Sequence, residues 1–162
     1  MTISEYELHG VTSTGADGMI AIGIDPGAKG GLAWVHEGQA VAMAFHRFTW
    51  REVWLELQSL TYNGNRCHAV LERVHAMPAQ GVSSTFKFGH AAGMAEGFLV
   101  AAGVPYDTVG AAKWQRKMSC LTKGDKNVTK EAASKLFPQL KITHAVADAL
   151  LLAEFCRREF CR

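Results

Sequence analysis

The chain has 162 residues and a formal net charge of +2 at pH 7; 48% of its residues are hydrophobic and 20% are charged. These values are typical of one globular domain with a core of its own. No apolar run reaches the roughly 18–20 residues that span a bilayer, and the opening MTISEYELHG lacks the pattern of a signal peptide. The four cysteines are scattered, without a C-x-x-C pair, so we expect a cytoplasmic protein with reduced thiols.

Positive charge is concentrated in one segment. Residues 111–141 hold 8 Lys or Arg against 2 Asp or Glu, whereas residues 1–110 hold 6 against 10. Such a block is a footprint for binding a polyanion. A solvated helix face would give the same bias, so charge alone leaves both interpretations open.

The first part of the chain predicts a tail and then three strands. Residues 1–18 are polar and aperiodic, which predicts a flexible N-terminal tail. The apolar run at 19–25 is typical of a strand buried on both faces, and it ends at Asp25, before Pro-Gly. Glycines then allow the chain to reverse, so strands at 30–36 and 39–45 complete a meander.

The rest of the chain alternates helices and strands. Thr49 and Glu52 form a capping box for an amphipathic helix over 50–61, whose tryptophans we expect in the core. A short strand at 68–71 ends in Glu72. The other expected elements are a helix that Ser83 or Ser84 caps and that runs to about 102, a strand at 106–109, a basic helix at 111–118, a helix from Asn127 or Thr129 to before Pro138, and a helix from 144 to about 159. This order predicts an α/β domain with a mixed sheet between helices.

Glycine recurs at every fourth residue of the expected helix that ends near 102. Gly89, Gly93 and Gly97 give that helix a face almost without side chains. Each glycine costs roughly 1 kcal/mol of helix stability, so a compensating close approach is expected. The partner is either the sheet or a second subunit.

Three acidic residues stand out by position. Asp25 and Glu72 end strands, and Asp148 lies among apolar residues of the last helix, four residues after His144. A carboxylate at the rim of a core needs a cation or a donor. If the helix packs over the strand ends, these oxygens, with an optional imidazole, suit Mg²⁺ or Mn²⁺ and phosphodiester cleavage. The alternative is that all three acids are structural caps and pairs.

Three motifs now carry a resemblance. IGIDPG, LERVHAMPAQG and HAVADALLLAE, in this order and spacing, resemble the RuvC-type Holliday junction resolvases of the RNase H-like superfamily, with phage and organelle branches most similar. The resemblance implies an RNase H-like nuclease domain over 19–162, with a five-stranded mixed sheet in the order 3-2-1-4-5. It also implies a homodimer that nicks four-way DNA junctions in pairs, as a hydrolase of recombination and repair, and leaves 5′-phosphates.

The resemblance also implies cofactors and a site. Two Mg²⁺ ions per active site are implied, with Mn²⁺ as a substitute and with no nucleotide cofactor and no membrane partner. The implied ligands are Asp25, Glu72 and Asp148, and His144 is implied as a ligand or a water-positioning base. The chain departs from the usual pattern at Ala145, where bacterial members carry a second helix acid. A phage-infected cell or an organelle matrix is also compatible with the family.

The basic segment is where family members contact the DNA backbone. The implied contacts are Lys113, Arg116, Lys117, Lys123, Lys126 and Lys130. We expect Lys123, on a loop with glycine, to lie nearest the scissile phosphate. The loop residues His75, Met77 and Gln80 are expected at the junction centre, and Gly89, Gly93 and Gly97 at the dimer interface.

Three other functions compete with a junction resolvase. One is a nuclease of the same fold for forks or flaps. Another is a junction-binding protein that has lost its chemistry, which the alanine at 145 favours. A fragment of an actin-like ATPase is the third, because G-I-D-x-G resembles a phosphate loop; the chain is too short for the two lobes that such enzymes need.

Overall fold

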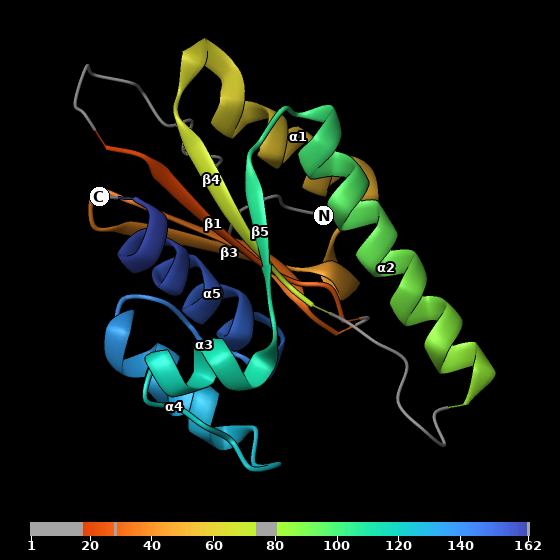
Figure 1. Cartoon of the computed structure of the whole chain (residues 1–162), viewed down its shortest axis with the longest axis vertical. Helices are drawn as coiled ribbons and strands as arrows, with labels where there is room; N and C mark the ends of the chain where they lie inside the picture. The colour runs from red at the N-terminus through yellow and green to blue at the C-terminus, as the bar shows by residue number, and fades with distance from the viewer. Residues whose placement is uncertain (1–17, 28, 74–80, 162) are drawn as a thin grey trace, which may run out of the picture.

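The computed structural model describes residues 18–27, 29–73 and 81–161 (Figure 1). The tail expected over 1–18 therefore lies almost wholly outside the described residues. So do His75, Met77 and Gln80, and their expected role at the junction centre stays a prediction.

A five-stranded sheet forms the middle of the molecule. Its strands are β1 (Ile20–Asp25), β2 (Gly31–His36), β3 (Gln39–Ala44), β4 (Cys67–Glu72) and β5 (Tyr106–Val109). They lie in the order β3-β2-β1-β4-β5, as expected. The meander of β1, β2 and β3 is antiparallel, whereas β4 and β5 run parallel to β1. The carboxyl ends of four strands thus share one edge of the sheet.

Five α-helices flank the sheet in the described part of the chain. They are α1 (Trp50–Thr61), α2 (Val82–Ala101), α3 (Ala111–Lys117), α4 (Asn127–Leu136) and α5 (His144–Phe160); short 3-10 turns η1 (Phe45–Arg47) and η2 (Tyr62–Gly64) precede and follow α1. The capping box of Thr49 and Glu52 is present. The expected cap of α2 is wrong: Gly81 takes the N-cap position, and the helix already includes Ser83 and Ser84.

The two faces of the sheet carry separate apolar cores. Helices α1 and α2 cover one face, onto which Ile20, Ile22 and Ile24 of β1 point. Helices α3, α4 and α5 cover the other, which receives the alternate residues of β1 and β4. Helix α5 is buried from Val146 to Cys156 apart from Asp148 itself, as expected for a helix at the centre of a core.

Gly23 sets how closely α5 packs on β1. A Cβ atom at this position would lie 2.1 Å from the Ala153 nitrogen and 2.3 Å from the Ala149 oxygen. No side chain fits there, so the backbone of α5 rests directly on the central strand. Asp148 is thereby brought to the face of the sheet from which Gly23 and Asp25 project.

The glycine face of α2 points away from the sheet. A Cβ atom added at Gly89, Gly93 or Gly97 would meet nothing within 4 Å. The side of α2 that packs on the sheet is formed instead by Ala91, Ala95 and Leu99. Of the two partners considered for the glycines, the sheet is therefore wrong.

Two expectations about the chain's environment can also be compared with the structure. No described helix combines the length and apolar character that crossing a bilayer would require. All four cysteines, Cys67, Cys120, Cys156 and Cys161, are free thiols.

Candidate active site

The two strand-end acids lie side by side at the rim of the sheet. The register pairs Ile24 of β1 with Leu71 of β4, so the next residues, Asp25 and Glu72, are neighbours on strands about 4.8 Å apart. Ile24 and Leu71 point to the face that α1 and α2 cover, so the side chains of Asp25 and Glu72, one residue later, point to the face that α5 covers. The sequence prediction that these two carboxylates meet at one edge is consistent with this register.

A tight turn holds Asp25. Its Oδ1 atom accepts a hydrogen bond from the backbone N–H of Gly27 at 3.1 Å, which lowers the pKa of the carboxyl group. Burial is the larger effect and raises that pKa above its ordinary value, and the nearby Asp148 carboxylate raises it further. Asp25 is therefore more than the cap of a turn, because it also interacts with a second acid.

Glu72 is held by an indole. Trp114 Nε1 of α3 donates a hydrogen bond to Glu72 Oε2 at 2.7 Å. Burial raises the pKa of Glu72 to about 7, and the Asp25 and Asp148 carboxylates contribute to the rise, while the bond from Trp114 opposes it. At neutral pH this carboxyl group is poised between its two protonation states.

Asp148 reaches the rim from the first turns of α5. Burial raises its pKa, and a hydrogen bond with the buried Thr129 hydroxyl and the charges of Lys126 and His144 lower it. Its Oδ1 atom is buried and has no hydrogen-bond partner in the part of the chain described. His144 is exposed, and its charge lowers the pKa of Asp148.

One lysine acts on all three acids. The positive charge of Lys126, the residue before α4, lowers the pKa of Asp25, Glu72 and Asp148 alike. Lys123 lies three residues earlier on an exposed turn, at φ +47°. Lys126 is thus a lysine whose charge acts on the acids. That Lys123 lies nearest the scissile phosphate stays a prediction.

The types of the candidate ligands, three carboxylates and an imidazole, fit a divalent cation, although their side chains do not converge on one point. Within the described ranges, no three His, Cys, Asp or Glu side chains are grouped closely enough to hold one ion, so the expected four-ligand cluster is not preformed. The unsatisfied Asp148 Oδ1 atom and the three raised pKa values are what a site for a hard cation with oxygen ligands would show.

The basic residues lie on α3, on α4 and on the chain between them, and these two helices cover the same face of the sheet as α5. Lys113, Arg116 and Lys117 are exposed on α3, whose buried side carries Trp114. Lys117 pairs with Glu159 of α5 at 3.1 Å, which anchors α3 on α5. The last of the predicted contacts, Lys130, lines a hollow on α4 with Asn127, Glu131, Ser134 and Lys135.

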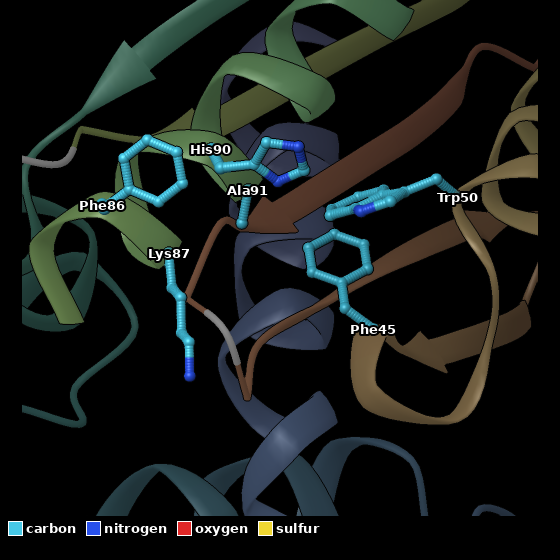
Figure 2. A pocket seen from close by; sticks show the side chains of 6 residues that line it. All are labelled: Phe45, Trp50, Phe86, Lys87, His90 and Ala91. Carbon is cyan, nitrogen blue, oxygen red and sulfur yellow. The ribbon is translucent and has the colours of Figure 1, made fainter. Parts of the chain in front are cut away.

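An aromatic groove lies on the opposite face of the sheet. Figure 2 shows the side chains of Phe45, Trp50, Phe86, Lys87, His90 and Ala91 around a hollow of about 380 Å³. The Phe45 and Trp50 ring centroids are 5.0 Å apart, and Trp50 is half-buried and packs against the core, whereas the buried residues of α1 are Val53, Leu57 and Leu60. No predicted site residue lines it.

The comparisons with known proteins agree with this geometry at the level of the fold. No protein-family model and no curated protein matches the chain. Thermus thermophilus RuvC in complex with a Holliday junction substrate superposes with a TM-score of 0.60 at 16% identity, over 89% of this chain and 99% of that one. The chain has the RuvC fold. A second RuvC structure from the same organism gives 0.58 at 17% identity, with the same coverage.

The RuvC fold and the five-stranded order were expected from the sequence. Trp114 was not expected at the site, and Lys126 was expected only as one of the contacts with the DNA backbone. Neither the bond from Trp114 nor the wide effect of Lys126 was expected. A signal for Trp114 exists in the sequence: it is the only large apolar residue within AAKWQRK, so the short helix buries it. No comparable signal separates Lys126 from the other lysines.

Proposed function

We propose that this protein is a metal-dependent endonuclease that resolves four-way DNA junctions. The observation that carries the proposal is the group of three half-buried, electrostatically coupled carboxylates from β1, β4 and α5 at one rim of a RuvC fold. The Asp148 carboxylate raises the pKa of Asp25 and Glu72, and Asp25 raises that of Glu72; such a cost in stability is typical of functional sites. The RuvC neighbour was solved with a Holliday junction substrate, which supports branched DNA as the substrate class.

Each part of the site has a role in this proposal. Asp25, Glu72 and Asp148 hold divalent ions, for which Mg²⁺ is the first candidate and Mn²⁺ the substitute, with His144 at the margin. When bound, such ions stabilise charge on a phosphodiester and lower the pKa of water. Lys126 stabilises the negative charge that grows on the scissile phosphate. The lysines and arginine of α3 and α4 bind the DNA backbone, with an affinity that falls as salt rises.

A homodimer completes the proposal. The outward glycine face of α2 lies on the same side of the helix as the exposed Val82 and Phe86, which are 87% and 74% accessible. Small residues flanked by apolar side chains allow two helices to approach closely, and a two-fold axis through such a contact makes the same patch serve both subunits. Two symmetric sites would then nick two strands of one junction.

The test uses a labelled four-way junction, a matched linear duplex and a flap, each with Mg²⁺, Mn²⁺ or EDTA. We expect paired, ligatable nicks in the junction alone, lost with EDTA and in Asp25→Asn. The matched control is Asp107→Asn, which changes a carboxylate of β5 that is 54% exposed and hydrogen-bonded to His68. It should cut as the wild type does.

The same assay separates the competing functions. Cleavage of flaps in preference to junctions would identify a nuclease for other branched DNA. Tight junction binding without cleavage in either metal would favour a non-catalytic binding protein. Ala145 and the absence of a preformed ligand group in the described ranges are the observations that keep this second candidate.

A further inference from the structure

The bond between Trp114 and Glu72 joins the basic helix α3 to the acidic rim. Trp114 is 0% exposed, and its indole Nε1–H lies 2.7 Å from Glu72 Oε2. An indole nitrogen can only donate, and a hydrogen bond to a carboxylate is among the stronger kinds that proteins make. The contact is therefore a directed bond and more than a packing contact.

The scaffold fixes the indole, and the indole in turn fixes the carboxylate. Glu72 is paired with Val109 of β5, and α3 begins two residues later, so a very short connection docks α3 on the rim. The Trp114 ring is part of the apolar core beneath α5. A tryptophan has two side-chain torsions and is packed here on all sides, whereas a glutamate has three torsions and lies at the rim.

The other side of helix α3 is exposed and basic. Lys113 and Arg116 are exposed there, within the segment proposed to bind the DNA backbone. A phosphate held by these residues would thus be held by the same rigid helix that orients Glu72. A shift of α3 would move both together.

We propose that Trp114 is a positioning residue, which holds the Glu72 carboxylate in the orientation needed to bind a divalent ion next to DNA docked on α3. This inference rests on the proposed function. It assigns a role to a residue that touches neither the ion nor the substrate. Residues in the second layer around a metal commonly change its affinity by roughly 10- to 100-fold.

The main experiment measures Mn²⁺ binding to the DNA-free protein by electron paramagnetic resonance. Trp114→Phe keeps an aromatic six-membered ring, removes the N–H donor together with the five-membered ring, and so also leaves a small cavity in the core. We expect its Mn²⁺ dissociation constant to rise about tenfold or more. The matched control is Trp54→Phe, since Trp54 packs against Phe98 between α1 and α2, with ring centroids 5.6 Å apart, on the opposite face of the sheet. It should bind Mn²⁺ unchanged.

A double-mutant cycle with Glu72→Gln separates positioning from general damage. If Trp114 acts through Glu72, then Trp114→Phe weakens Mn²⁺ binding in the wild-type background and adds little in the Glu72→Gln background. Equal losses in both backgrounds would overturn the positioning role. On junction DNA, the same variant should lower kcat while KM stays within about twofold.

A measurement on the unsubstituted protein covers the case in which Trp114→Phe does not fold. The indole N–H signal of Trp114 in a ¹⁵N–¹H spectrum should shift on Mg²⁺ binding and broaden with Mn²⁺, and those of Trp50 and Trp54 should change far less. If the Trp114 signal neither shifts nor broadens when the ion binds, the inference is overturned. If the wild-type protein nicks junctions but the effects of Trp114→Phe and Glu72→Gln on Mn²⁺ binding simply add, the positioning role alone is overturned. If the wild-type protein neither binds Mn²⁺ nor nicks junctions, the proposed function is overturned as well.

Discussion

Removing the charge of Glu72 should stabilise the metal-free protein. Burial, and after it the Asp25 carboxylate, raises the pKa of Glu72 from 4.5 to about 7. The folded state therefore binds this proton more tightly than the unfolded state does. Its contribution to stability is complete below pH 4.5 and is lost as the pH rises to about 7. Above that pH the ionised carboxylate is a full burden on the folded state.

The size of the effect follows from the shift in pKa. Each pKa unit corresponds to 1.36 kcal/mol, so a shift of about 2.5 units is worth about 3 kcal/mol at pH 8. Glutamine cannot ionise, and its side-chain oxygen can still accept the bond from Trp114. We expect Glu72→Gln to raise the free energy of unfolding at pH 8 by up to about 3 kcal/mol, with a gain that shrinks towards pH 5.

Urea unfolding in EDTA, followed by circular dichroism at several pH values, checks this expectation. The control is Glu131→Gln, which changes an exposed carboxylate of α4 and should shift stability by less than about 0.5 kcal/mol. Saturating Mg²⁺ should stabilise the wild type and narrow its gap to the variant. A Glu72→Gln protein that is less stable at pH 8, or whose gain is the same at pH 5, would refute the electrostatic reasoning.

Two further predictions concern DNA cleavage and assembly. Lys126→Gln should lower the single-turnover nicking rate by roughly 100-fold. It should also move the acid limb of the pH–rate profile to higher pH, because the lost charge lowers the pKa of all three carboxyl groups. Lys123→Gln is the comparison, and a larger loss of rate in that variant would favour Lys123, the lysine expected from the sequence. Gly93→Ala should strengthen α2 by up to about 1 kcal/mol in the monomer, where the added methyl group meets nothing within 4 Å. The same variant should weaken the dimer in sedimentation experiments, and an unchanged dimer would place the interface elsewhere.

Local patterns were sufficient for the strands and helices, because the informative residues act through their neighbours in the chain; the order of the strands was implied by the family resemblance. An apolar run that ends at Asp25 defines the central strand wherever the rest of the chain lies. The strand that ends at Glu72 is defined in the same way, and the parallel register then brings the two acids together. The last helix could be assigned to the site in the same way, because an acid among apolar residues, as at Asp148, has few purely structural explanations.

The parts that the sequence could not predict depend on how α3 and α4 dock. The chain between these helices passes through positive φ angles at Ser119, Lys123 and Gly124. Which lysine such a turn directs at the acids is a matter of three-dimensional geometry. The start of α2 failed for a local reason, since Gly81 can take the N-cap position that two nearby serines were expected to fill.

The contact of α5 with Gly23 affects the order in which the three acids come together during folding. The meander of β1, β2 and β3 closes through short loops, whereas α5 meets β1 across more than 100 residues of sequence, and contacts of such long range form slowly. Asp148 arrives with α5. A partly folded chain that already has its sheet would thus hold Asp25 beside Glu72 without the third acid, so the gain of tight metal binding during refolding would report the docking of α5.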